Sequence, residues 1–396
     1  MSRTELLLFL NAAHFLTHYG LLIFPTAALA IAPAWGMTFA DVLLLGSPLY
    51  VAFALGTLPA GWLGDRYDRL ALIAVAFLGI GGSCLAIALS SGPVSLAAGL
   101  GALGLFASLY HPVGLALVTD GESRSGRALA VNGVFGNLGL AGAAAATGVL
   151  AQVWHWQAAF AVPGTIALLI GGLLFARSGL NVDRRCPTRA PSGDGPSSGS
   201  LPHQRTVFLV VCVSALLGGL IFNMVTIALP KFLDERLARN GIDLAWIGLS
   251  TGLVFAVAAI AQLPVGELLD RIGARPVLTA LLTAQAALFL ALSQATGWGA
   301  LVLALLAVTC LFAEIPITTW LLGRHLAPGI RSRAISVEYT LSLGVGSVAA
   351  PLLAVLHGVG IGFSVQFVGL AVCACAVLVA ARCLPGQSPS GSDRRI

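Results

Sequence analysis

Two histidines lie four residues apart in an otherwise apolar stretch near the start of the chain, NAAHFLTHYGLLIFP. On a helix, His14 and His18 would share one face, about one turn apart. Two imidazoles so placed can share a hydrogen bond, pass a proton or contact a solute, and they can also chelate a metal ion. A third metal ligand is not evident from the sequence, so metal binding is the lesser alternative.

Five more polar residues lie inside apolar runs farther along the chain. They are Tyr110, His111, Asn223, Thr226 and Glu314. Such groups are costly at bilayer depth and often mark solute or proton pathways, so we predict that they and the two histidines line a solute and proton site. Glu314 is the candidate proton carrier. The competing interpretation is structural, with a neutral glutamic acid bonded to a helix carbonyl and imidazoles that only join helices.

Composition identifies the kind of segment that must position these groups. Of the 396 residues, 58% are hydrophobic and 9% are charged, against about 25% charged in soluble domains. The chain therefore reads as an all-α polytopic membrane protein. Its formal charge of +5 comes almost entirely from arginine in the connecting segments, which does not indicate nucleic-acid binding. The seven cysteines show no Cys-x-x-Cys pair, and no enzyme motif occurs, so we predict no metal site, cofactor or catalysis.

Charged and Gly/Pro-rich segments divide the chain into twelve apolar runs of about 20 residues each, the length that crosses a bilayer. We predict a six-helix bundle over residues 1–178, a cytoplasmic linker over 179–205, a second bundle over 206–384 and a cytoplasmic tail over 385–396. We interpret the apolar N-terminal run as a retained first span, because it continues past the point where a signal peptide would stop.

Basic residues predict the orientation of these spans. Of the 21 lysines and arginines, only Lys231, Arg236 and Arg239 fall in segments that would lie outside. The positive-inside rule then places both termini in the cytoplasm. We expect a multi-pass protein of a bacterial-type cytoplasmic (inner) membrane, surrounded by the lipid bilayer.

The two halves of the chain repeat each other. An offset of 205 residues pairs Pro25 with Pro230, Pro59 with Pro264, Gly61 with Gly266, Asp65 with Asp270, Arg66 with Arg271 and His18 with Asn223. His111-Pro112 and Glu314-Ile315-Pro316 also occupy similar places in spans four and ten. Two related six-helix halves are typical of transporters whose site lies at the repeat interface.

A charged loop after the second span, GWLGDRYDR, recurs after the eighth as GELLDRIGAR. Glycine lets a neighbouring helix approach closely, aspartate accepts hydrogen bonds, and arginine pairs with acids. We predict a gating latch between moving bundles, and the alternative is a charge cluster that only fixes topology. The latch residues are Gly61, Asp65, Arg66, Arg69, Gly266, Asp270, Arg271 and Glu338, the last a candidate partner for Asp65.

This duplicated loop resembles the signature Gly-x-x-x-Asp-Arg-x-Gly-Arg-basic of the major facilitator superfamily. Asp68 and Leu70 depart from it in the first copy. The resemblance, which covers all twelve spans, implies two pseudo-symmetric six-helix bundles around a cavity lined by spans one, four, seven and ten. It also implies a monomer that works by alternating access, in which the latch stabilises the state closed to the cytoplasm.

The segment GLGALGLFASLYHPVG resembles the fosmidomycin-resistance branch of drug exporters. That branch carries an acid where this chain has Val113, so a role of that acid does not transfer. The arginine of span four in common drug–proton antiporters is replaced by Leu100. The proline motif that those antiporters carry in span five is also missing.

The predicted function is proton-coupled export of a small drug-like or amphipathic organic solute. No lysine or arginine is predicted inside a span, which argues against a strongly anionic solute, and aromatic residues would suit an amphipathic one. These aromatics are Phe15, Tyr19, Tyr110 and Trp320. The alternatives are proton-coupled uptake of a nutrient or metal-bearing compound, and a membrane assembly factor or receptor that transports nothing.

Overall fold

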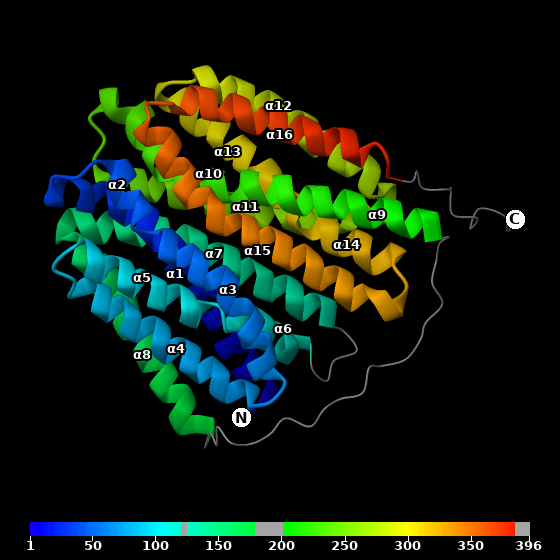
Figure 1. Ribbon diagram of the computed structural model, residues 1–396, viewed down its shortest axis with the longest axis horizontal. Coiled ribbons are helices and arrows are strands. Elements are labelled where there is room, and N and C mark those ends of the chain that lie inside the picture. Colours follow the sequence, from blue (N-terminus) through cyan, green and yellow to red (C-terminus); the bar gives the residue numbers. More distant parts are fainter. Residues whose placement is uncertain (120–124, 179–200, 385–396) are drawn as a thin grey trace, which may run out of the picture.

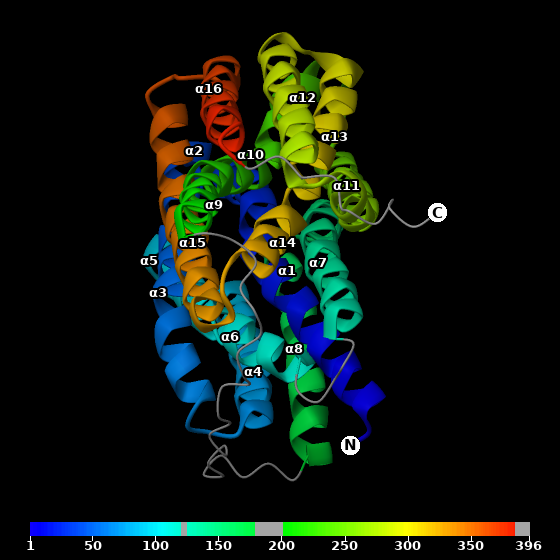
Figure 2. The same cartoon turned by 90° about the vertical axis from the view of Figure 1, so that its right-hand side faces the viewer.

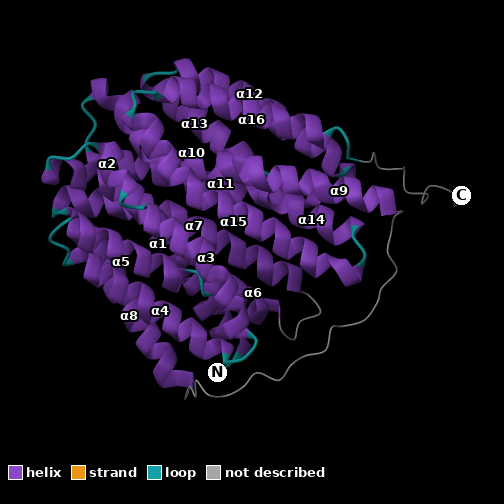
Figure 3. Cartoon of the chain, viewed as in Figure 1, coloured by secondary structure: helices purple, strands orange, loops and turns teal. Residues whose placement is uncertain are grey.

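The computed structural model describes residues 1–119, 125–178 and 201–384, and within these ranges every regular element is a helix (Figure 3). Twelve helical runs are long and apolar enough to cross a membrane. This confirms the predicted all-α fold with twelve spans. The predicted tail and most of the predicted linker lie outside the described residues.

The first six spans contain eight helices because two of the spans are interrupted. The helices are α1 (Arg3–Trp35), α2 (Phe39–Leu44), α3 (Ser47–Gly64), α4 (Arg69–Ala88), α5 (Pro93–Ala107), α6 (Tyr110–Thr119), α7 (Ser125–Val153) and α8 (Trp156–Ser178). Local chemistry starts several of them. Ser2 and Glu5 form a capping box at α1, and Asp68 caps α4 by accepting from the backbone of Leu70 and Ala71.

The last six spans follow the same plan. Their helices are α9 (Leu201–Val213), α10 (Gly219–Leu237), α11 (Leu244–Ile272), α12 (Ala274–Gln294), α13 (Gly297–Ala313), α14 (Ile315–His325), α15 (Pro328–Gly358) and α16 (Phe363–Ala381). A π-helical turn, Ser214–Gly218, joins α9 to α10, and a short 3-10 turn, Ala238–Asn240, follows α10.

Spans four and ten break at corresponding positions. Helix α5 ends at Ala107 before α6 starts, and α13 ends at Ala313 before α14 starts. These two ends are 206 residues apart, in line with the sequence repeat. Each break precedes a proline. Proline has no backbone N–H to donate, and its ring clashes with the carbonyl one turn earlier, so a continuous helix is disfavoured. The breaks place His111 and Glu314 at the start of the second helical piece of each span.

The two sets of six spans occupy different parts of the molecule. In Figure 2, α12, α13 and α16 form the upper part and α3, α4 and α8 the lower part. We call the end that contains Arg3, the Gly64–Arg69 turn and Leu201 the linker end, and the opposite end, with Trp35 and Gly358, the far end. The arginine distribution predicts that the linker end faces the cytoplasm.

The halves pack closely at the far end through α7 and α11. A methyl group added to Gly148 would lie 2.6 Å from the Leu244 carbonyl oxygen, and one added to Gly248 would lie 2.5 Å from the Ala144 carbonyl oxygen. No side chain fits at either position, so the two backbones touch. Small residues permit this approach in membrane helices.

A second far-end contact joins α2 to the last six spans. The ring of Phe39 lies 5.7 Å from the His357 ring and 5.5 Å from the Lys231 ammonium nitrogen. At the linker end the halves diverge: Figure 1 shows the ends of α4 and α8 at the bottom and the start of α9 at the right, well apart. The molecule is therefore closed at the far end.

Candidate functional site

Three histidines meet near the middle of α1. The Nε2 atoms of His14 and His18 are 3.1 Å apart, and the ring of His111 is centred 5.3 Å from each of the other two rings. The sequence predicted that His14 and His18 share a face but offered no third ligand beside them. The structure corrects this point, because the break in span four brings His111 to the pair. We call these three residues the histidine cluster.

Glycines of α7 hold α1 in the position that forms the cluster. A methyl group on Gly139 would lie 2.2 Å from the Phe15 carbonyl oxygen, so the two backbones approach directly. One turn away, a methyl group on Gly136 would lie 2.6 Å from the His14 Nε2 atom. The His14 ring therefore rests on a part of α7 that has no side chain.

Asn132 of α7 joins the elements around His14. The Nδ1 atom of His14 donates to the Asn132 backbone oxygen at 2.7 Å, and the Tyr110 hydroxyl donates to the Asn132 side-chain oxygen at 2.8 Å. The Asn132 amide donates to the Asn11 side-chain oxygen at 2.9 Å. Because a carbonyl only accepts, the neutral His14 ring must carry its proton on Nδ1, which leaves Nε2 as an acceptor for His18.

Asn132 and Asn11, both buried within spans, were not among the predicted site residues. Their signal in the sequence is an amide group inside an apolar run, which is costly at bilayer depth like the ionisable residues. Tyr110, predicted to contact solute, is fully buried and stacks on His14 with ring centres 4.7 Å apart. In this conformation it supports His14 from behind.

The two polar residues predicted on span seven form hydrogen bonds within α10. The Thr226 hydroxyl donates to the Phe222 carbonyl at 2.7 Å, and the Asn223 amide donates to the Gly219 carbonyl at 2.9 Å. Asn223 also faces α15, where a methyl group on Gly346 would lie 3.1 Å from its side-chain oxygen. The sequence repeat pairs Asn223 with His18, but among the described contacts Asn223 is not joined to the histidine cluster.

Glu314 occupies the break between α13 and α14. Its Oε1 atom is buried and has no hydrogen-bond partner among the described residues. Glu314 belongs to the second half, whereas the histidine cluster belongs to the first. No described hydrogen bond or ring contact links the two. The cluster itself reaches the second half through His111, whose ring is centred 6.5 Å from that of Tyr339 on α15.

The first predicted latch loop forms contacts within its own half. The Arg69 guanidinium donates to the Gly64 carbonyl at 3.0 Å and lies 3.9 Å from the Asp65 carboxylate. Arg66 lies over the Trp62 ring at 4.0 Å. Gly61 allows α6 to approach, with Pro112 3.8 Å from an added methyl group. The Asp65 side chain is 79% exposed, which leaves it accessible at the linker end.

The second latch loop is equally local. Asp270 accepts a hydrogen bond from the Trp320 indole at 3.0 Å, Arg271 pairs with Glu267 one turn earlier, and no atom lies near a methyl group added to Gly266. Trp320, one of the expected cavity aromatics, thus lies at the linker end in this conformation. Glu338 accepts from Thr318 at 3.3 Å rather than contacting Asp65. The latch contacts described above each join residues of the same half.

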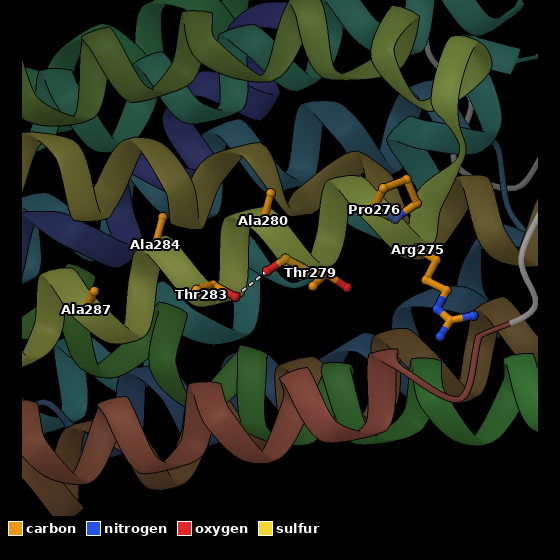
Figure 4. Close-up of a pocket in the computed structure, with 7 residues that line it drawn as sticks. All are labelled: Arg275, Pro276, Thr279, Ala280, Thr283, Ala284 and Ala287. Atoms are coloured by element: carbon orange, nitrogen blue, oxygen red, sulfur yellow. Dashed lines mark hydrogen bonds between the residues drawn. The ribbon is translucent and has the colours of Figure 1, made fainter.

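A groove elsewhere on the molecule follows one face of α12 (Figure 4). It extends from Arg275 to Ala287 and includes none of the predicted site residues. The hydroxyl of Thr283 in its wall donates to the Thr279 carbonyl of the same helix at 2.7 Å. Apart from Arg275 and two threonines, proline and alanine line this groove, so it offers few polar groups for recognising a solute.

A duplicated twelve-span fold, with helices broken beside polar residues partway along two spans, is typical of transporters of small solutes. The sequence model of the Major Facilitator Superfamily matches residues 7–240 and 211–395, and the chain belongs to that superfamily. A curated relative is the probable 4-methylmuconolactone transporter of Cupriavidus pinatubonensis (strain JMP 134 / LMG 1197). It is 28% identical over 261 residues, which span 63% of this chain and only 59% of the relative.

Solved structures share the fold. The crystal structure of a bacterial homolog to the human lysosomal transporter Spinster, inward-facing and unoccupied, aligns with a TM-score of 0.77 over 98% of this chain and 100% of that chain. The inward-facing and occupied form of that homolog aligns with the same score over 98% and 99%. Sequence identity is 15% in both cases, so the likeness concerns the fold.

Proposed function

We propose that this chain couples the movement of protons to that of a small organic solute across a cytoplasmic membrane by alternating access, with Glu314 as the proton carrier. The observation that carries the proposal is the buried Glu314 Oε1 atom, which has no described hydrogen-bond partner at the break of span ten. An ionised carboxylate without a partner is costly at this depth. Protonation and contact with a solute are two ways to satisfy it, and competition between them would couple the two movements.

The histidine cluster is the proposed solute-binding partner of Glu314. His18 and His111 are half-buried, whereas His14 is buried behind them, and their imidazoles can donate or accept hydrogen bonds. His111 approaches Tyr339 of the other half. A solute held between the halves would change its contacts when they move, as alternating access requires.

The curated relative suggests an oxygen-containing organic solute of the lactone class as the first compound to test. Export is our leading direction because the sequence resembles drug exporters. Uptake is the second candidate, favoured by the relative, whose described solute is a lactone rather than a drug. With the linker end in the cytoplasm, closure at the far end would make this conformation inward-facing.

Transport by purified protein in proteoliposomes tests the role of Glu314. With 4-methylmuconolactone as the first solute of a panel, an imposed proton gradient should drive accumulation by the wild type. Glu314→Gln cannot exchange a proton, so the proton gradient no longer drives the solute. Gradient-driven accumulation should fall at least about tenfold, which corresponds to about 1.4 kcal/mol of lost coupling free energy. Solute exchange in the absence of a gradient should survive.

The matched control is Glu267→Gln, because that acid is exposed and pairs only with Arg271 along α11. It should accumulate solute like the wild type. Gradient-driven accumulation by Glu314→Gln at the wild-type rate would remove Glu314 from the coupling mechanism. Reversing the gradient in the same vesicles distinguishes export from uptake, and a wild type inactive with every solute would favour the assembly-factor alternative.

A further inference from the structure

We infer that His14, His18 and His111 form a binding site for one transition-metal ion, with Zn²⁺ as the probe ion. Histidine, cysteine, aspartate and glutamate can all bind metal ions. Among the residues that the structure describes, these three histidines are the one group of three or more such side chains whose candidate ligand atoms all lie within 4.8 Å of one another. This inference does not depend on the proposed function, because metal binding and solute transport are measured separately.

The geometry of the first pair approaches that of a zinc site. Zinc binds histidine nitrogen at about 2.0–2.1 Å in a tetrahedron, which separates neighbouring ligand nitrogens by about 3.3 Å. The Nε2 atoms of His14 and His18 are 3.1 Å apart. The candidate ligand atom of His111 lies within 4.8 Å of the other two. A change in the His111 side-chain angles would bring it to the third ligand position of the tetrahedron.

Hydrogen bonding around the cluster prepares His14 as a ligand. Its Nδ1–H donates to the Asn132 backbone oxygen, which turns the unprotonated Nε2 toward the cluster. Metal-bound histidines in proteins show this arrangement, in which a carbonyl fixes the ring and its tautomer. Asn132 is held in turn by Tyr110 and Asn11, so the supporting shell is fully bonded and buried.

A second observation concerns His111. Its Nδ1 atom is buried and has no hydrogen-bond partner among the described residues. Buried polar atoms are normally satisfied, so an imidazole nitrogen with no protein partner beside two other histidines is suited to bind a ligand. An all-imidazole donor set suits Zn²⁺, Cu²⁺ or Ni²⁺ and is poor for Ca²⁺ or Mg²⁺, which prefer oxygen.

A metal at this site would join α1 to α6, the piece of span four that follows the break. His14 and His18 belong to one continuous helix, whereas His111 belongs to the piece that begins after the break. Three protein ligands leave the fourth tetrahedral position for water or for an oxygen atom of another molecule. The half-buried His18 and His111 mark the side from which that ligand would enter.

Equilibrium dialysis with ⁶⁵Zn²⁺ tests the inference on the purified full chain, freed of any affinity tag and kept in detergent. The wild type should bind one Zn²⁺ per chain. His18→Gln and His111→Gln should each weaken binding at least about a hundredfold, since loss of an outer-shell group alone costs 10–100-fold. The matched control is His203→Gln, which removes one member of the separate His203–His325 pair, and it should bind like the wild type.

Two further measurements keep the test decisive. Gel filtration and thermal unfolding without metal identify any variant that has not folded, and the other cluster variant then decides. X-ray absorption of the Zn²⁺ complex should show three imidazole nitrogens at about 2.0 Å. Absence of stoichiometric binding by the wild type, or full binding by both folded cluster variants, would overturn the site.

Discussion

At the scale of single residues, the candidate site depends on buried groups that support the histidine cluster. Asn132 accepts from His14 with its backbone and from Tyr110 with its side chain, and it donates to Asn11. These bonds connect α1, α6 and α7 around one buried amide. The tautomer and position of His14 therefore follow from Asn132, although the chemistry belongs to the imidazole.

Removal of the Tyr110 hydroxyl should show how much the hydrogen bonds of Asn132 contribute to thermal stability. Tyr110→Phe keeps the ring that stacks on His14 but leaves the Asn132 side-chain oxygen without that donor. A buried polar group left unsatisfied costs about 1–3 kcal/mol, so the apparent thermal midpoint in detergent should fall by several degrees. Tyr67→Phe is the control: Tyr67 is half-buried, and its hydroxyl takes part in no described hydrogen bond, so a smaller fall is expected. Equal midpoints for Tyr110→Phe and the wild type would contradict the argument.

At the scale of helices, glycine sets how closely the two halves can meet. Gly148 and Gly248 face each other across α7 and α11, and Gly252 lies near the Ala141 carbonyl oxygen, 2.7 Å from an added methyl group. These positions leave no space for even one carbon atom. At these positions α7 and α11 close the far end by direct contact of their backbones.

Gly248→Val should weaken that closure. Its branched side chain would press on the Ala144 carbonyl oxygen and on the Gly148 backbone, so the halves must separate at the far end. Spin labels at Trp154 and Trp298, exposed residues at the far end of each half, should report a longer or broader distance distribution by pulsed electron paramagnetic resonance. Gly172→Val, where the structure leaves open space, should keep the wild-type distribution. If both variants give the wild-type distances, glycine contact does not control closure.

At the scale of the whole molecule, the sequence predicted the twelve spans and their duplication, because hydropathy and the 205-residue repeat are properties of the linear chain. The similar places of His111-Pro112 and Glu314-Ile315-Pro316 were visible in the sequence, but the breaks beside them were not predicted. The contacts inside the site did not follow, since they depend on how each helix is rotated. His111 joins His14 from the piece of span four that follows the break, and Trp320 forms a hydrogen bond to Asp270.

The closed far end offers a direct test of movement between the halves. An added Cβ at Gly358 of α15 would lie 3.4 Å from the Ala40 Cβ of α2, close to the 3.5–4.5 Å typical of disulfides. In a background without native cysteines, Ala40→Cys with Gly358→Cys should cross-link on mild oxidation and lock the far end. If transport requires that end to open, solute flux in proteoliposomes should fall at least about tenfold and recover with reductant. Each single cysteine variant should be unaffected by oxidation. A cross-linked protein with undiminished flux would show that the far end need not open, and alternating access between these two halves would then be excluded.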